Sequence, residues 1–152
     1  MQSMLFRSRS ARALDAKGRL MLPPKFREIL LARSEGGRLA LVTYDNCIVG
    51  FPWPDWIDFE QKLTHMPIAP LIIRNFKRLV VGGMEDHCAD NQGRILLSRE
   101  QLAYAGIEKD VVLQGVGARF EIWAPERLAA ILAQNVDDVA PSLADSGIDL
   151  VF

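Results

Sequence analysis

Two segments of the chain carry the same pattern of aspartate, glycine and arginine. Residues 15–22 read Asp-Ala-Lys-Gly-Arg-Leu-Met-Leu and residues 90–97 read Asp-Asn-Gln-Gly-Arg-Ile-Leu-Leu, an offset of 75 positions. In each segment the aspartate can accept hydrogen bonds from the backbone that follows it, and the glycine tolerates unusual φ angles, so both segments predict tight turns. An arginine beside such a turn can donate two parallel hydrogen bonds to guanine or phosphate. The repeated pattern therefore predicts a surface that binds nucleic acid.

The two copies differ in the cations beside the turn. The first copy has Lys17 and Arg19, whereas the second has Gln92 and Arg94 at the equivalent positions. Arginine fits guanine O6 and N7, and lysine supplies a point charge to phosphate. We therefore expect Arg19, Lys17 and Arg94 to contact DNA, and we expect the first copy to make the stronger contact.

Basic residues are concentrated near the start of the sequence. Residues 1–33 carry eight basic and two acidic side chains, a net charge of +6, although the net charge of the whole chain is −1. We expect Arg7, Arg9 and Arg12, which precede the first turn, to contact phosphates and position the protein rather than read bases. Residues 135–152 carry four aspartates and no base, a net charge of −4.

The spacing of each aspartate and arginine also allows an ion pair that closes the turn. A carboxylate facing DNA phosphates would be repelled, so we expect the aspartates to shape the turns. For Arg19 the ion pair and the DNA contact are both open, and its basic surroundings favour the contact. The residues assigned to turn shape are Asp15, Gly18, Asp90 and Gly93.

The segments around the turns predict a repeated β-β-α-β-β unit. Apolar residues alternate after each turn as in a short strand, and the two flanks of the turn are expected to pair as a hairpin. A helix follows, started by Pro23-Pro24 in the first copy and by a Ser98–Gln101 capping box in the second. Glycines 36–37 and 106 are expected to end these helices. The predicted helices span 25–31 and 99–105, and the predicted second hairpins pair 39–43 with 47–51 and 111–115 with 119–123.

Each unit is too small to bury a stable core alone, so the two copies are expected to pack on each other about a pseudo-two-fold axis. Apolar residues at helical spacing predict connector helices over 56–63 and 68–79, separated by Pro67 and Pro70. A last helix is expected over 126–133, followed by a weakly ordered acidic tail.

Composition and motifs exclude several other classes of protein. At 49% hydrophobic and 24% charged residues the chain is expected to fold, and no apolar run reaches the roughly 18 residues of a membrane span. Cys47 and Cys88 are expected to be reduced, half-buried thiols, and together with His65 and His87 they show no metal-ligand spacing. The sequence contains neither a phosphate-binding Walker loop nor the G-x-S-x-G motif of a serine nucleophile. We expect no enzyme activity, cofactor, metal, small-molecule substrate or membrane contact.

The chain resembles the MraZ family, bacterial transcriptional regulators built from two tandem SpoVT/AbrB-type domains. The resemblance lies in Phe6-Arg7, residues 14–19, Pro23, residues 26–28, Asp90, Gly93-Arg94, residues 104–106 and residues 120–123. It implies an α+β, mainly β fold in which the repeats form a swapped-hairpin barrel. The implied divisions are 6–56 for the first SpoVT/AbrB-type repeat, 57–84 for a helical connector, 85–128 for the second repeat, and 129–152 for the helix end and acidic tail.

The resemblance also implies a function. It implies a ring-shaped homo-oligomer in the cytoplasm, associated with the nucleoid, that binds short direct repeats in double-stranded DNA. Those repeats would lie upstream of a division and cell-wall gene cluster that the protein autoregulates.

Three residues depart from the family pattern. Ser8 replaces a glycine, Ser98 replaces a proline, and Leu102 replaces an arginine after the second helix start.

An alternative function stays open, an antitoxin-like module that binds a partner protein through the acidic tail.

Overall fold

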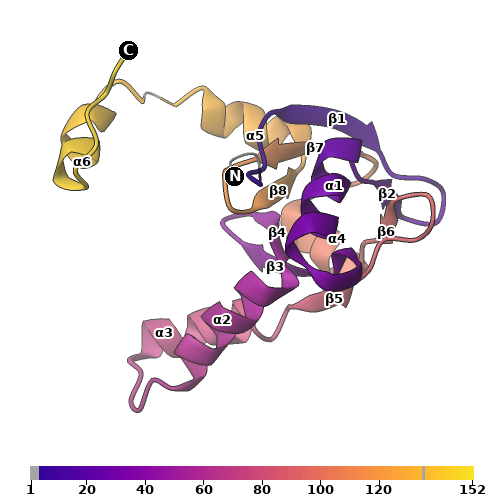
Figure 1. The fold of residues 1–152 in the computed structure, drawn as a ribbon, viewed down its shortest axis with the longest axis horizontal. Coiled ribbons are helices and arrows are strands. Elements are labelled where there is room, and N and C mark those ends of the chain that lie inside the picture. Colours follow the sequence, from indigo (N-terminus) through magenta and orange to yellow (C-terminus); the bar gives the residue numbers. More distant parts are fainter. Residues whose placement is uncertain (1–3, 135) are drawn as a thin grey trace.

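The computed structural model describes residues 4–134 and 136–152, which form a mixed α+β fold around a six-stranded antiparallel sheet. The strand order of this sheet is β1-β7-β8-β4-β3-β5, and β2 and β6 form a separate two-stranded ribbon (Figure 1). In the described part of the chain, every helix is too short or too polar to cross a membrane.

Each copy contains the β-β-α-β-β order predicted from the sequence. The first copy consists of β1 (Arg9–Ala13), β2 (Arg19–Met21), α1 (Pro24–Arg33), a 3₁₀ turn η1 (Glu35–Gly37), β3 (Leu39–Tyr44) and β4 (Cys47–Pro52). The second consists of β5 (Glu85–His87), β6 (Arg94–Leu96), α4 (Arg99–Ala105), β7 (Asp110–Gly115) and β8 (Phe120–Trp123).

The prediction that the flanks of each turn pair as a hairpin is wrong. β1 pairs with β7, β5 pairs with β3, and β2 pairs with β6, so every first or second strand of one copy lies against a strand of the other. In the first turn, one backbone hydrogen bond joins the two flanks, and it runs from Asp15 N to Arg19 O at 3.0 Å. The alternation of apolar residues shows which face of a strand is buried but not which strand it joins. The exchange makes the core common to both copies.

The helix ends follow the predicted chemistry in part. α1 begins at Pro24, and the Ser98 hydroxyl accepts a hydrogen bond from Gln101 N at 3.1 Å at the start of α4. Gly106 ends α4 in a left-handed conformation with φ of 68°. In the first copy α1 ends at Arg33, before the glycines, and these form η1 instead.

The main core lies between the sheet and the helices of the two repeats. Phe6, Phe26 and Phe120 meet there with ring centroids 5.1–5.3 Å apart. Gly50 lies opposite Phe120, and a Cβ at this glycine would lie 2.3 Å from the ring. Leu20 and Ile95 are buried in the same core and anchor the ribbon to it.

The connector forms two helices, α2 (Trp53–Thr64) and α3 (Leu71–Val80), which pack on a second apolar cluster through Trp56 and Val80. The second helix begins at Leu71 rather than at residue 68, because Pro70 restricts the residue before it to extended conformations.

The end of the chain carries two further helices, α5 (Pro125–Leu132) and α6 (Val139–Asp145). The expectation of a weakly ordered tail is therefore corrected, since residues 139–145 are helical; Asn135 lies outside the described residues. Figure 1 shows α6 standing apart from the sheet.

Candidate nucleic-acid interface

The turn before β2 is held by the carboxylate of Asp15. One carboxylate oxygen accepts hydrogen bonds from the backbone N–H groups of Lys17 and Arg19, both at 2.9 Å, and the other accepts from Arg19 Nε at 2.6 Å. Gly18 N donates to Asp15 O at 3.0 Å, and Gly18 has a φ of 82°. A side chain at Gly18 would therefore be strained.

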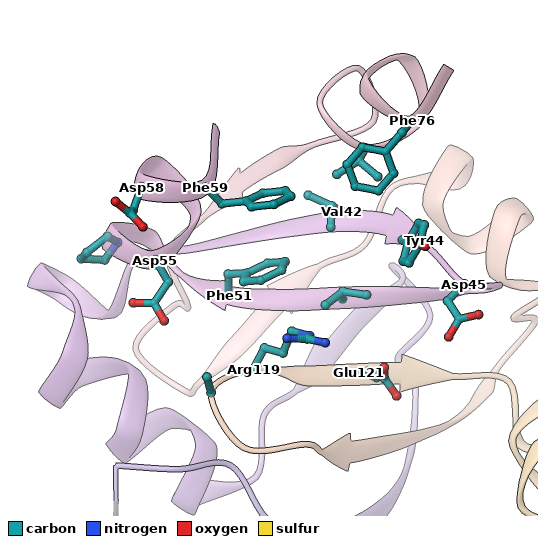
Figure 2. Close-up of a pocket in the computed structure, with 14 residues that line it drawn as sticks. Val42, Tyr44, Asp45, Phe51, Asp55, Asp58, Phe59, Phe76, Arg119 and Glu121 are labelled. Atoms are coloured by element: carbon teal, nitrogen blue, oxygen red, sulfur yellow. The ribbon is translucent and has the colours of Figure 1, made fainter. Parts of the chain in front are cut away.

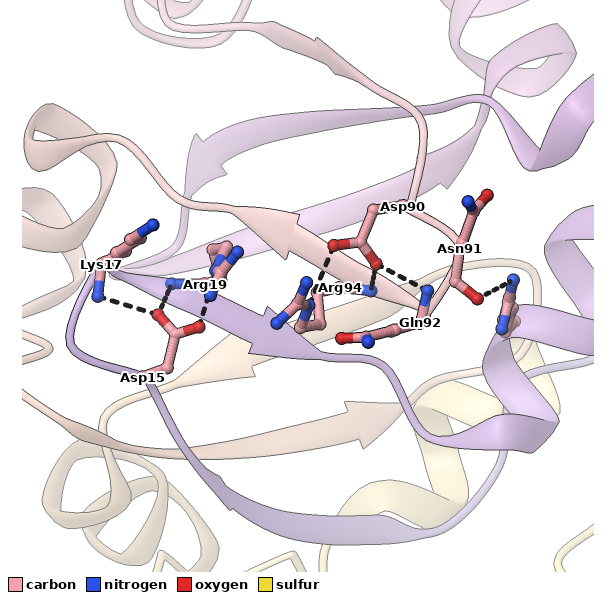
Figure 3. Close-up of polar contacts among 8 residues, drawn as sticks. Asp15, Lys17, Arg19, Asp90, Asn91, Gln92 and Arg94 are labelled. Carbon is pink, nitrogen blue, oxygen red and sulfur yellow. Dashed lines mark hydrogen bonds and ion pairs between the residues drawn. The ribbon is translucent and has the colours of Figure 1, made fainter.

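The turn before β6 repeats this geometry. The Asp90 carboxylate accepts from the backbone N–H groups of Gln92 and Arg94 and from Arg94 Nε, all at 2.9 Å, and Gly93 also has a φ of 82°. Figure 3 shows the two turns on either side of the β2–β6 ribbon. The two copies thus present the same local structure twice.

The strand register places the two turns at opposite ends of the ribbon. Arg19 pairs with Leu96 and Arg94 pairs with Met21, so the two arginines occupy diagonal corners. The central pair, Leu20 and Ile95, is buried, which leaves the other four residues on the outer face.

Hydrogen bonding affects the charge state of both aspartates. The backbone N–H of Arg19 is the largest cause that lowers the pKa of Asp15 below its usual value, and the backbone N–H of Arg94 does the same for the pKa of Asp90. Both carboxylates are therefore ionised at neutral pH. Each arginine uses Nε for its aspartate, and its two terminal amino groups provide four further donors.

The second turn has a cation that sequence reasoning did not assign. Arg27, on α1 of the first copy, donates to the backbone O of Asn91 at 3.4 Å and lies against Gly93. Gln92 occupies the position that Lys17 has in the first turn, so Arg27 replaces the missing charge. Its signal was present in the Phe26-Arg27-Glu28 motif, but only the exchange of strands brings α1 to the second turn.

The three early arginines do not share one face. Arg7 and Arg9 are exposed, and Arg9 Nε donates to the Gln114 side chain on the neighbouring strand β7. Arg12 lies on the opposite face of β1, because successive strand residues alternate, and it is half-buried. Arg9 and Arg12 thus lie on opposite faces of the edge strand β1, and Arg7 precedes this strand.

Two exposed apolar side chains were also missed. Met21 and Leu96 are 43% and 54% exposed on the outer face of the ribbon, between the diagonal arginines. The alternation of Leu20 and Ile95 with their neighbours could have identified them, since the residues on either side of a buried strand residue face outward.

A hollow lies on the face of the six-stranded sheet that is opposite the main core. It has a volume of about 650 Å³ and lies between strands β3, β4 and β8 and helices α2 and α3 (Figure 2). Its wall includes Phe51 and Phe59, and its charged residues are Asp45, Asp55, Asp58, Arg119 and Glu121. The excess of carboxylates would repel DNA phosphates, so this hollow is not part of the candidate interface.

The cysteines and histidines do not gather into a metal site. Within residues 4–134 and 136–152, no three metal-ligating side chains come together. Cys47 is a buried free thiol whose pKa is raised chiefly by burial, and Cys88 is an exposed free thiol, which corrects the expectation that both are half-buried. Burial also lowers the pKa of His87.

Known proteins resemble the chain over nearly its whole length. A family model described as "MraZ protein, putative antitoxin-like" matches residues 5–79 and 80–142. "Transcriptional regulator MraZ" of Nitratidesulfovibrio vulgaris (strain Hildenborough) is 56% identical over 149 residues, covering 98% of this chain and 100% of the relative. The protein of the same name from Maridesulfovibrio salexigens is 42% identical over 98% of this chain and 100% of its own, and that from Bordetella pertussis is 36% identical over 93% and 95%.

Proposed function

Because this chain belongs to the MraZ family of transcriptional regulators, we propose that it regulates transcription by binding double-stranded DNA through the β2–β6 ribbon and its two turns. The proposal is for a regulator that acts by binding and not by catalysis. The observation that carries it is the pair of Arg19 and Arg94, held at diagonal corners of one ribbon by equivalent hydrogen bonds to Asp15 and Asp90.

The geometry of the ribbon supports this proposal. A two-stranded ribbon fits the major groove of B-DNA, where an arginine can donate to guanine O6 and N7. Each aspartate orients its arginine through Nε, so less side-chain entropy is lost when the terminal amino groups bind a base. Lys17 and Arg27 add one further cation to each turn and would contact phosphates.

The apolar residues of the ribbon have a matching role in this proposal. Met21 and Leu96 lie between the two arginines and would contact the thymine methyl group, the apolar feature of the major groove. Arg7, Arg9 and Arg12 are proposed as contacts to the DNA backbone, with Arg9 and Arg12 on opposite faces of β1.

We further propose that several copies assemble as a ring on short direct repeats. The repeats would lie upstream of a division and cell-wall gene cluster, and binding there would autoregulate the cluster from the nucleoid in the cytoplasm. Linked weak contacts raise affinity through effective concentration, which allows a chain with a net charge of −1 to bind DNA tightly.

A gel-shift titration tests the proposal. The DNA immediately upstream of the gene is titrated with wild-type protein at two salt concentrations, beside Arg19→Ala, Arg94→Ala and the control Arg119→Ala. Arg119 is an exposed cation in the acidic hollow, away from the ribbon. We expect salt-sensitive binding by the wild type and the control, and losses of about tenfold or more for the two ribbon variants.

Each other outcome has a definite meaning. If the ribbon variants bind as the wild type does, the protein binds DNA through another surface. If the wild type binds neither this DNA nor a random-sequence pool, the DNA proposal is wrong.

The second candidate is an antitoxin-like protein that binds a partner protein through residues 136–152. The wording of the family description and the exposure of this acidic segment favour it. Deletion of residues 136–152 that removes a specific copurifying protein while DNA binding stays intact would support this candidate over the first.

A further inference from the structure

Two segments outside the ribbon have opposite charges of equal size. Residues 61–84 contain Lys62, Arg74, Lys77 and Arg78 and no acidic residue, a net charge of +4. Residues 136–152 contain four aspartates and no basic residue, a net charge of −4. We call these the basic segment, which includes α3, and the acidic segment, which includes α6.

The basic segment exposes apolar side chains next to its cations. Ile68, Leu71 and Ile72 are 88%, 57% and 76% exposed, which is unusual for side chains of this type in a folded domain. The opposite side of α3 is already occupied, since Phe76 and Val80 pack into the second apolar cluster. The helix therefore has one apolar side inside the protein and a second one open to solvent.

The acidic segment has the same combination of features with the charge reversed. Val136, Ile148 and Leu150 are 71%, 53% and 43% exposed, and aspartates lie between them in the sequence. On α6, Val139 and Leu143 are four residues apart and so lie on the same side of the helix.

We propose that the acidic segment of one copy of this chain docks on the basic segment of a second copy, with α6 lying along α3. The apolar side chains of the two segments cover each other, and Asp138, Asp145 and Asp149 pair with Arg74 and Arg78 at the edge of the contact. Lys62 already forms an ion pair with Asp58 at 3.0 Å in its own chain. The inference rests on the proposed assembly of several copies and names the surface that joins them.

The contact is between two different surfaces of the same chain. Such a head-to-tail contact builds a ring when the rotation between neighbours closes, rather than a simple dimer. The acidic segment is short compared with the roughly 20–30 residues per side of a standard interface, so one contact is weak and closure of the ring strengthens it.

The basic segment of a second copy fits the acidic segment better than two other basic surfaces do. These two are the basic segment of the same chain and the basic residues around the ribbon. Within one chain, α6 and the α2–α3 pair project from the body at separate places (Figure 1). The basic residues around the ribbon are the other attractive surface, but the most exposed apolar side chains among the basic regions are Ile68 and Ile72 of the basic segment.

The experiment measures molar mass by light scattering after gel filtration. The first variant reverses charges on α3 (Arg74→Glu, Arg78→Glu), and the second reverses charges in the acidic segment (Asp138→Lys, Asp145→Lys, Asp149→Lys). A third variant combines all five substitutions, and Arg99→Glu with Lys109→Glu is the matched control. All seven positions are exposed, so each variant is expected to fold, as thermal unfolding will show.

The expected result is a loss and a recovery of assembly. The wild type and the control form a multimer, the first and second variants shift toward the 17.0 kDa of one chain, and the five-substitution variant recovers the multimer. Recovery identifies the pairing, since it restores opposite charges without restoring either original surface.

Three outcomes would overturn the inference. The first is a wild type that is monomeric, and the second is a set of reversed variants that keep the wild-type mass. The third is an acidic-segment variant that keeps its mass but gains affinity for DNA, which would place the acidic segment on the cations of the ribbon. Gel shifts on the same samples separate this inference from the proposed function, because a wild type that assembles without binding DNA contradicts only the latter.

Discussion

The Arg27 guanidinium, in the first repeat, donates a hydrogen bond to the backbone oxygen of Asn91, in the turn of the second repeat. The contact exists because β2 and β6 pair across the repeats and bring α1 beside the second turn. The equivalent residue of α4 is Leu102, which packs partly buried against the core. The exchange of strands thus gives the second turn the cation that the first turn has in Lys17, so each turn has one cation in addition to its ribbon arginine.

We predict that Arg27→Ala weakens DNA binding as much as Lys17→Ala. Each variant removes one cation beside a turn from every copy, so the slope of log affinity against log salt should fall in both by about one for each copy bound to the DNA. Gel shifts over a salt series measure the slope, with Arg119→Ala as control. An unchanged slope for Arg27→Ala would mean that this arginine only supports the turn.

The ionised Asp15 carboxylate is expected to stabilise the folded protein at neutral pH and to lose this effect as acid protonates it. The pKa of Asp15 is lowered in the folded protein, so the unfolded chain takes up the proton first as the pH falls. Asp15→Asn should therefore lower the Tm at pH 7, and the difference from wild type should shrink below about pH 4 as the wild-type carboxyl is protonated. Thermal unfolding from pH 7 to 3 measures this, with Asp110→Asn as an exposed control. A difference that stays constant with pH would contradict the role of the charge.

Ser8→Gly should make the protein more stable. Ser8 has a φ of 73°, and its backbone oxygen accepts a hydrogen bond from Gly115 N at 2.9 Å. A left-handed conformation costs a non-glycine residue about 1–2 kcal/mol, and the extra entropy of glycine in the unfolded chain offsets part of that gain. We expect a net gain of about 0.5–1 kcal/mol in the free energy of unfolding by urea titration. Ser8→Ala keeps the Cβ and should differ little from wild type, and a loss of stability in Ser8→Gly would contradict the prediction.

Gln101 is expected to join the two repeats. It is 1% exposed, and its amide nitrogen donates to Leu41 O at 3.0 Å in the first repeat and to Gly83 O at 3.1 Å. Gln101→Met keeps the volume but leaves these carbonyls without the amide donor, so the free energy of unfolding should fall by about 1–3 kcal/mol. Ser98→Ala, which removes only the helix cap, should lose about 1 kcal/mol. Urea unfolding compares them, and a stable Gln101→Met would show that the bonds contribute nothing net.

Much of the local structure could be predicted from the sequence. The two aspartate-glycine turns, the helix starts at Pro24 and Ser98, and the hairpin turn at Asp45-Asn46 all depend on residues close together in the chain. The φ angles of Asp45 and Asn46 are 56° and 65°, as a two-residue hairpin turn requires. The second half of the capping box did not follow, because the Gln101 side chain binds Leu41 and Gly83 instead.

The cations of the candidate site were only partly predictable. Arg19, Arg94 and Lys17 follow from the repeat, but the separation of Arg12 from Arg9 depends on where β1 enters the sheet. The position of Arg27 depends on the exchange of strands, and no local pattern encodes it.

By itself the sequence determined the turns, the helices and the alternation of apolar residues, because these arise from interactions within a few residues. Only the tertiary structure decided which strands pair, and with that the diagonal position of Arg19 and Arg94, the place of Arg27 at the second turn, and the exposure of Met21 and Leu96. The physical reason is that a strand with one apolar face can be buried equally well against several partners. The choice among them is made by the packing of the whole core, in which Leu20 and Ile95 from different repeats meet side by side.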